Sequence, residues 1–349
     1  MTQHTLPLAG IRVLDFSELL PGPFFTQNLV ELGASVLKIE RPPHGDNARI
    51  MAPGLFASVN RGKQSVMADL KDPAQAARIR EMVTETDVVV EGYRPGVMDR
   101  LGFGYEALAA LNPRIVYVSL SGYGQTGRLA KSPGHDVNYL ATAGVLALSG
   151  SDPERPGHGA GLPLADLCGA MYALSSTLAA LLQRQTTGVG QYLDVALTDC
   201  VMHWMNPRLG HFDEAGLDEL AAQRNDVLAK PAYGVFRTAD GSHVSLGALE
   251  DHFWSRLATA LVLDLPLAGY ERLAARVHDA PRINAAIAAS VATFDADTLL
   301  ALLDAADVPV SRVVEPSALR ASAHAVERRL IRTDDEAAFI RYPVKMSGM

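Results

Sequence analysis

The amino-acid sequence predicts an α/β protein: a large Rossmann-like domain built on a mostly parallel sheet, followed by a smaller α+β domain. Short apolar segments alternate with helical segments through the first 200 residues, the pattern of a parallel sheet that helices cover on both faces. Near residue 240, a turn sequence between two short apolar segments predicts a β-hairpin and marks the smaller domain. A hydrophobic content of 48% and a charged content of 20% are those of a folded globular chain.

The strands and helices of the larger domain follow from this alternation. Its strands are expected at residues 11–16, 35–39, 87–91, 114–119 and 191–195. Its helices are expected at residues 24–32, 73–85, 136–148 and 164–185. Gly33 stands at a good C-cap position for the first helix. Asp72, followed by Pro73, is a favourable N-cap for the second.

The second half of the chain follows a different pattern. We expect a large domain, a linker, a small domain and a return segment at residues 1–202, 203–230, 231–307 and 308–349. The linker is assigned because its sequence is irregular and charged. In the small domain, Thr238–Gly241 is the hairpin turn, and helical patterns run from Glu250 to about Leu303. A strand-like stretch at 308–314 is expected to begin the return to the large domain.

Charge and cysteine content exclude several classes of partner. The formal net charge is −8, which argues against a nucleic-acid backbone as a partner. Cys168 and Cys200 are the only cysteines, and no C-x-x-C or H-E-x-x-H spacing occurs, so we expect a reducing compartment and no structural metal. No signal peptide is evident, and the apolar stretch Ala170–Leu182 is too short to span a bilayer. We therefore expect a cytoplasmic protein with no membrane partner.

One segment matches a nicotinamide-cofactor fingerprint in letters alone. Residues Gly102–Ala107 fit G-x-G-x-x-A. The fingerprint binds a pyrophosphate only at a turn from a strand into a helix. Here it follows residues 97–101, which are expected to be helical, so we do not expect a dinucleotide site.

Eight motifs stand in order in the first 200 residues, and a ninth lies near residue 250. Together they resemble the class III CoA-transferase family, which includes carnitine and formyl CoA-transferases and α-methylacyl-CoA racemases. The resemblance covers nearly the whole chain. The motifs are Leu8–Asp15, Lys38–Pro42, Asn60–Lys63 with Asp69–Lys71, Glu91–Gly96, Ser121–Gly127, Gly134–Tyr139, Leu164–Asp166, Thr187–Gln191 and Gly247–Phe253.

The resemblance implies a particular assembly and substrate. Two chains are expected to interlock like rings in a homodimer. Active sites would then form between the large domain of one chain and the small domain of the other. The substrate is expected to be an acyl-CoA thioester, so coenzyme A enters as part of the substrate and no separate cofactor is required.

Within the family, the Gly134–Asp136 motif is closest to that of the racemases. The resemblance implies that His135 and Asp166 remove and return the α-proton of a 2-methylacyl-CoA thioester, and that Glu250 supports the histidine. Two bases on opposite sides of the α-carbon suit this reaction, and an imidazole with a carboxylate is a suitable pair. Racemisation through an enolate is therefore the leading expectation.

Asp136 leaves the type of reaction open. In transferases that resemble this chain, an aspartate at its position attacks the thioester, and CoA then passes to an acceptor acid. In the racemase interpretation, backbone N–H groups near Asp136 or in the Gly122–Tyr123–Gly124 turn would stabilise the enolate oxygen. Asp136, Asp166 and Glu250 each precede or open a helical run, so each could instead be only a helix cap.

Cations within the motifs are expected to hold the phosphates of CoA. They are Arg41, Arg61, Lys63 and Arg94, and the alternative for each is a solvated surface charge. Leu70 and Tyr93 are expected to border the adenine. Two departures matter: the segment before Asp166 lacks an asparagine common in racemases, which favours a transferase, and a Pro-Arg-rich tail of many relatives does not follow Tyr342.

Overall fold

The computed structural model describes residues 6–150, 156–157, 161–334 and 337–346. Among these residues the chain divides into two compact units. The first is formed by residues up to 150, by 156–211 and by those from 332 onward; the second is formed by 212–331. The chain therefore leaves the first unit later than expected, after residue 211, and returns to it at 332.

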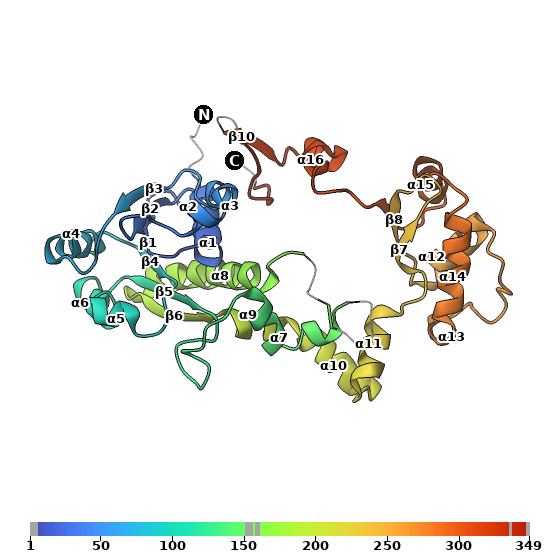
Figure 1. Ribbon diagram of the computed structural model, residues 1–349, viewed down its shortest axis with the longest axis horizontal. Coiled ribbons are helices and arrows are strands. Elements are labelled where there is room, and N and C mark those ends of the chain that lie inside the picture. The colour runs from blue at the N-terminus through green and yellow to red at the C-terminus, as the bar shows by residue number, and fades with distance from the viewer. Residues whose placement is uncertain (1–5, 151–155, 158–160, 335–336, 347–349) are drawn as a thin grey trace. The chain divides into compact units, whose positions relative to one another are not determined.

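The first unit contains the predicted Rossmann-like parallel sheet (Figure 1). All of its neighbouring strands pair in parallel, in the order β3-β2-β1-β4-β5-β6. The order reverses between β1 and β4, and ligands of such sheets bind outside the carboxyl ends of the strands at that point. The strands are β1 (Arg12–Asp15), β2 (Ser35–Glu40), β3 (Gln64–Met67), β4 (Val88–Glu91), β5 (Val116–Ser121) and β6 (Gln191–Ala196).

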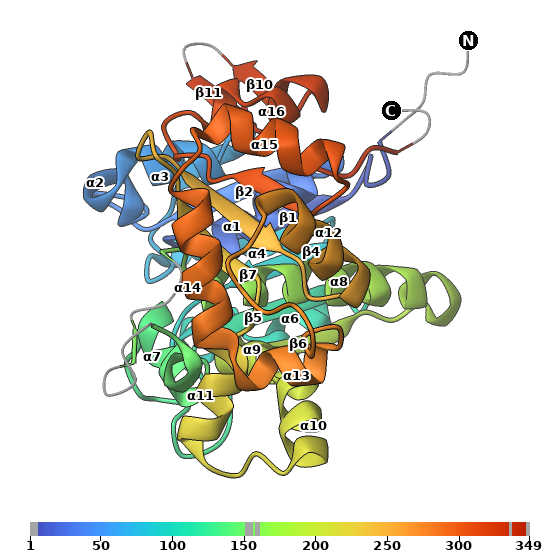
Figure 2. The ribbon, with the colours of Figure 1, turned by 90° about the vertical axis from the view of Figure 1, so that its right-hand side faces the viewer.

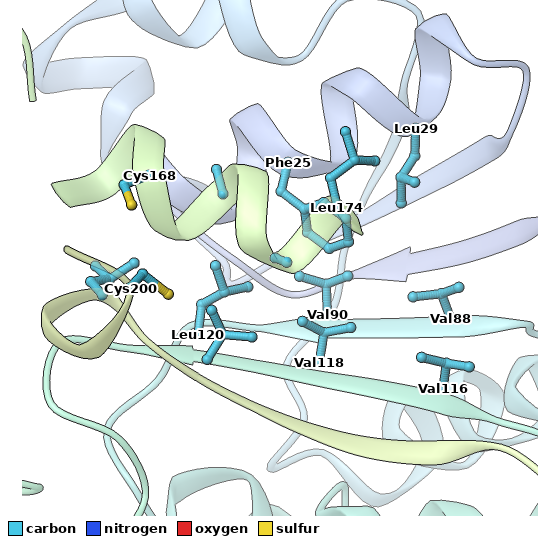
Figure 3. Packing of buried hydrophobic residues seen from close by; sticks show 14 of the residues in the cluster. Phe25, Leu29, Val88, Val90, Val116, Val118, Leu120, Cys168, Leu174 and Cys200 are labelled. Carbon is cyan, nitrogen blue, oxygen red and sulfur yellow. The ribbon is translucent and has the colours of Figure 1, made fainter. Parts of the chain in front are cut away.

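Helices cover both faces of this sheet. On one face, α1 (Pro21–Glu31) packs against α8 (Leu164–Thr187), and both rest on valines of β4 and β5 (Figure 3). On the other face, α4 (Pro73–Val83) and α6 (Tyr105–Leu111) enclose a second cluster around Phe16 and Phe103. The remaining helices of this unit include α2 (Ala48–Met51), α3 (Pro53–Val59), α5 (Val97–Leu101), α7 (Asp136–Thr142) and α9 (Leu197–Trp204).

Several local predictions are confirmed. The Asp72 carboxylate accepts hydrogen bonds from Ala74 N and Gln75 N and so caps α4. The G-x-G-x-x-A segment runs from the end of α5 into α6 and does not follow a strand, as expected. Gly102 is in the left-handed conformation with φ +74° and ends α5. The geometry of a dinucleotide fingerprint is therefore missing from this segment.

Helix α8 is longer than the sequence indicated. With 24 residues, it is long and apolar enough to cross a bilayer by length and composition, and half of its most apolar window is buried inside the protein. Its buried side includes Cys168, Ala173 and Leu174, which contact the sheet cluster. The alternation of buried and exposed positions is that of a core helix with one solvent-facing side.

The second unit is a small α+β domain (Figure 2). The predicted hairpin is present, with Arg237 paired to His243 across the turn. The stretch expected to carry the chain back forms β9 (Val310–Arg312), which is the third strand of this antiparallel sheet, and this pairing keeps it in the second unit. The other elements are β7 (Tyr233–Arg237), β8 (His243–Gly247), α12 (Asp251–Leu261), α13 (Leu273–His278), α14 (Ala280–Val291) and α15 (Ala296–Ala305).

The expectation that residues 203–230 are irregular is wrong. They contain α10 (Asn206–Ala215) and α11 (Leu220–Leu228). Each helix buries one residue almost completely: Phe212 is 4% exposed and Arg224 is 5% exposed. The sequence conceals these helices because neither carries a broad apolar stripe, and such a stripe is the main signal for a helix in a sequence.

Candidate active site

The loop before α7 is held by its own side chains. Asn138 Oδ1 accepts a hydrogen bond from His135 N at 3.0 Å. The Tyr139 hydroxyl donates to the Gly134 carbonyl at 2.6 Å. His135 is the N-cap residue of α7, and its side chain is exposed. The backbone of the motif is therefore fixed while the imidazole stays accessible.

Two glycines make room for the Tyr139 ring. A Cβ on Gly122 would lie 2.3 Å from that ring, and a Cβ on Gly134 would lie 2.6 Å from it. Tyr123 packs edge-on against Tyr139, with ring centroids 5.2 Å apart. Burial raises the pKa of Tyr139 to about 12, so its hydroxyl remains a donor at neutral pH. The ring thus joins the turn after β5 to the loop before α7.

The turn after β5 has further support from β6 and α9. The Gly122 carbonyl accepts hydrogen bonds from Thr198 N at 3.1 Å and from Thr198 Oγ1 at 2.8 Å. Gly124 has φ +82°, a conformation that favours glycine. Gln125 N donates to Asp194 Oδ2 at 3.0 Å. The predicted Gly122–Gly124 turn is therefore a rigid element beside the loop that carries Asp136.

Asp136 is a helix cap, but of a helix other than its own. Its Oδ1 accepts hydrogen bonds from Ala165 N at 2.7 Å and from Asp166 N at 3.2 Å. Both N–H groups belong to the first turn of α8, where they have no partner within the helix. The two predicted aspartates, 30 residues apart in the sequence, are thereby brought together.

Asp166 is the more perturbed member of this pair. Burial, and then the negative charge of Asp136, raise the pKa of its carboxyl group to about 7. No hydrogen bond or ion pair from the described residues reaches its carboxylate. An uncommitted carboxyl group whose pKa lies near neutrality can act as an acid, a base or a nucleophile.

A cavity of about 630 Å³ lies at the carboxyl ends of the first four strands. It brings together three of the residues predicted to contact CoA: Arg41, Leu70 and Tyr93. It also places Lys71 and Arg100 on the same wall, and sequence reasoning missed both as ligands. Lys71 ends a motif already identified, and Arg100 lies on α5 before the rejected fingerprint. The cavity also includes Phe16, Ile39, Ala68, Asp69, Val97 and Leu101.

Arg94 lies apart from this cavity. It is exposed and lines a neighbouring cavity of about 340 Å³. Glu91 lies in the same cavity, and burial raises the pKa of its carboxyl group to about 7 even though Ser119 Oγ and Tyr93 N donate to it. The charge of Arg94 is close enough to Tyr139 to favour the ionised phenol.

Two predicted CoA ligands are engaged inside the protein. The Lys63 side chain is 1% exposed. Its ammonium contacts Asp15 Oδ2 at 3.2 Å, Thr26 Oγ1 at 2.7 Å and Asn60 Oδ1 at 2.9 Å. Burial lowers its pKa to about 8. This arrangement leaves Lys63 no N–H group for a phosphate, because an ammonium has three donors.

Arg61 is engaged by the C-terminal segment. Its guanidinium pairs with Glu31 and lies over the Phe339 ring at 4.3 Å from the centroid. Tyr342 N donates to the other Glu31 oxygen at 2.7 Å. Phe339 belongs to β11 (Ala337–Ile340). In this structure Arg61 therefore anchors the returning chain to α1 instead of presenting its charge to a ligand.

Glu250 belongs to the second unit. It is the exposed N-cap residue of α12 and makes no side-chain capping bond there. Its support of His135 and the interlocked homodimer remain predictions. Among the described residues, no group of three or more histidine, cysteine or acidic side chains is arranged to hold a metal ion.

Comparisons with known proteins show the family of this chain. The profile of CoA-transferase family III matches residues 8–349. The acetyl-CoA:oxalate CoA-transferase of Acetobacter aceti is 33% identical over 98% of this chain and 90% of its own length. The α-methylacyl-CoA racemase of Homo sapiens is 36% identical over 74% of this chain and 65% of its own length. A CAIB/BAIF family protein from Brucella suis superposes with a TM-score of 0.88 at 28% identity, covering 99% of this chain and 93% of that one. The chain therefore belongs to CoA-transferase family III.

Proposed function

We propose that this protein is a CoA-transferase that moves CoA between two carboxylic acids, with Asp166 as the nucleophile. The observation that supports it most is the state of Asp166: a largely buried carboxyl group, free of hydrogen bonds from described residues, at the start of α8. Several relatives, including the Acetobacter aceti protein that matches 98% of this chain, are named as CoA-transferases.

This assignment differs from the sequence-based expectation, which gave the nucleophilic role to Asp136. Asp136 Oδ1 already accepts two backbone N–H groups. Those bonds occupy lone pairs that an attacking oxygen needs. A desolvated carboxylate with a raised pKa is more basic, because its ionised form is poorly solvated. Asp166 is therefore the better nucleophile.

The reaction balances with these groups alone. The Asp166 carboxylate attacks the acyl carbon of the donor thioester, an O–C bond forms, and the C–S bond breaks to release the CoA thiolate. The thiolate then attacks the aspartyl carbonyl carbon of the mixed anhydride, which frees the donor acid and leaves CoA on Asp166 as a thioester. The acceptor carboxylate follows the same two steps in reverse order and regenerates the Asp166 carboxylate.

A transfer assay with two variants tests the proposal. Purified protein is mixed with acetyl-CoA or succinyl-CoA and a panel of mono- and dicarboxylic acids, and new acyl-CoA esters are separated by chromatography. We expect transfer to at least one acid, lost in Asp166→Asn and retained in part in Asp136→Asn, whose amide oxygen can still accept from α8. Full loss in Asp136→Asn with transfer intact in Asp166→Asn would reverse the assignment.

Racemisation of a 2-methylacyl-CoA is the second candidate. It is favoured by the exposed His135 imidazole on the loop that also carries Asp136, and by the 36% identity to the human racemase. Asp166, with a pKa of about 7, would then supply the second proton. The test is deuterium incorporation at the α-carbon of a single epimer in D₂O with no acceptor acid present. Exchange with loss of chirality, abolished in His135→Ala, would favour the racemase over the transferase.

A further inference from the structure

The loop between β1 and α1 forms part of the wall of the 630 Å³ cavity. Phe16, its first residue, lines that cavity. The loop leaves β1 at the point where the strand order reverses, which is where a ligand of this fold binds. Its conformation therefore sets the shape of one side of the site.

Two fully buried charges of opposite sign hold the backbone of this loop. Lys38 Nζ donates to the Ser17 carbonyl at 2.5 Å and lies 2.9 Å from Asp46 Oδ2. Asp46 Oδ1 accepts from Leu19 N at 3.0 Å and from Ala48 N at 2.8 Å. The exposed fractions of the two side chains are 1% and 0%. The pair thus contacts the loop at two points, one carbonyl and one N–H.

The loop requires such support because of its backbone. Leu19 has φ +66°, in the left-handed region that a leucine adopts only at a cost. A conformation of this kind persists where the surrounding structure imposes it. The hydrogen bond from Leu19 N to Asp46 is a contact that supports it here.

The same pair joins this loop to a second wall of the cavity. Asp46 follows β2 by a few residues, in the loop that begins with Arg41, and Arg41 lines the cavity too. Asp46 N donates to Glu40 Oε2 at 2.8 Å. Asn47 Nδ2 donates to Glu18 Oε2 at 2.7 Å, which adds a second link between the loops.

Stability alone does not explain a charged pair at this place. The desolvation of two buried charges offsets much of their attraction, and an apolar pair of similar size is often as stable. An apolar pair, however, would leave the Ser17 carbonyl and the Leu19 N–H without partners, and neither contact with the loop would remain. The charged pair therefore serves to fix the position of the loop.

We propose that Lys38 and Asp46 are positioning residues for CoA: they hold the Phe16 wall and the Arg41 wall of the cavity at the spacing that the ligand requires. This inference rests on the proposed function only in taking CoA as the ligand of the cavity. It assigns to the pair no contact with the reacting atoms.

The test compares CoA binding by calorimetry and initial rates of transfer for three full-length proteins: wild type, Lys38→Met and Arg184→Met. Arg184 is the control, because it also forms an ion pair, with the partly buried Asp87 (Oδ1 at 2.8 Å), and donates to a backbone carbonyl, that of Arg114, at 3.0 Å. Its pair lies at the opposite end of β4, away from the cavity lining. Both substitutions should lower the urea midpoint.

We expect Lys38→Met to raise the Kd for CoA and the KM for the acyl-CoA donor by at least about tenfold with kcat changed far less, and Arg184→Met to leave both constants unchanged. Lys38→Arg should recover part of the affinity. If Lys38→Met does not fold, Asp46→Ala replaces it, because this change removes both the ion pair and the hydrogen bond that Leu19 N donates.

Three outcomes are distinguishable. CoA affinity equal to that of wild type in Lys38→Met, or in Asp46→Ala where that variant replaces it, would overturn the inference. Equal losses in Lys38→Met and Arg184→Met would overturn it as well, because a general loss of stability would then explain both. Failure of the wild-type protein to bind CoA would instead contradict the proposed function.

Discussion

The Asp136 carboxylate caps helix α8 through the backbone N–H groups of Ala165 and Asp166, and so places its negative charge beside the Asp166 side chain. One carboxylate therefore fixes the backbone of the other and adds to the rise in its pKa that burial causes. Both effects come from a single contact between a loop and the start of a helix.

The first prediction concerns stability against pH. The pKa of Asp166 is raised from 3.8 to about 7 in the folded protein, so between these values the folded state binds more protons than the unfolded state. Stability contributed by this group is therefore greatest below pH 4 and falls as the pH rises to 7. Asp166→Asn should be more stable than wild type at pH 8, by on the order of a few kcal/mol, and the difference should vanish near pH 4. Urea unfolding at both pH values measures the difference in stability between the variant and wild type. The same difference at pH 4 and at pH 8 would contradict the raised pKa.

The second prediction concerns the pH dependence of the rate. A carboxylate nucleophile must be ionised, so the rate of transfer should rise with pH through a midpoint near 7. Asp136→Asn removes the neighbouring charge, which contributes to the raised pKa, and should move this midpoint to lower pH. The measurement is kcat/KM against pH for both proteins. A midpoint that moves to higher pH in the variant would be incompatible with the charge interaction.

The third prediction concerns the glycine beneath Tyr139. Gly122→Ala places a Cβ 2.3 Å from the Tyr139 ring, which must shift. We expect a loss of about 1–3 kcal/mol of stability and a large fall in kcat, because the ring supports the Gly134 loop. Gly54→Ala is the control: it lies in α3, and its added Cβ would meet nothing within 4 Å. Near-equal thermal midpoints for the two variants would show that Tyr139 does not hold this loop.

The fourth prediction concerns the cations of the CoA cavity. Lys71 and Arg100 are exposed side chains that line it, so either change to alanine should weaken CoA binding, and more so at low salt. We expect each substitution to raise the Kd for CoA roughly tenfold at low ionic strength. Arg12→Ala is the control, an exposed arginine whose ion pair with Glu85 lies at the start of β1. If both cavity variants bind CoA with the wild-type affinity, CoA does not bind in this cavity.

The fifth prediction separates structure from binding at Lys63. Lys63→Met leaves the Asp15 carboxylate buried and without its cation, so we expect a loss of about 3–5 kcal/mol of stability. The folded variant should bind CoA with the wild-type Kd, since the ammonium is enclosed by Asp15, Thr26 and Asn60. Calorimetry below the unfolding midpoint measures the affinity. If a stably folded Lys63→Met variant binds CoA weakly, Lys63 is a CoA ligand after all.

The parallel sheet could be predicted because its strands are apolar runs separated by helical segments, and five of the six strands were found. The sixth, β3, reads Gln-Ser-Val-Met, lies at the sheet edge and has exposed residues at both ends, so it lacks the apolar pattern of a buried strand. Helices α10 and α11 were missed for the corresponding reason, since a polar helix without an apolar stripe resembles a loop in sequence.

The membership of the candidate site could be predicted better than the contacts within it. Asp136, Asp166, Arg41 and Tyr93 could be identified because each lies in a short sequence motif of the family that the chain resembles. They could not show that Asp136 caps a helix that starts 28 residues later, or that Lys63 pairs with Asp15. Such pairings depend on tertiary contacts between segments far apart in the chain, and no local pattern encodes them.

In the proposed reaction, CoA transfer passes through a covalent intermediate on Asp166, and this intermediate can be trapped. The protein is incubated with acyl-CoA, treated with borohydride, digested and analysed by peptide mass spectrometry. An aspartyl thioester is reduced to an alcohol at the residue that carries it, and we predict this mark at residue 166 with residue 136 unmodified. A mark at residue 136, or steady transfer with no mark at either aspartate, would show that Asp166 is not the nucleophile.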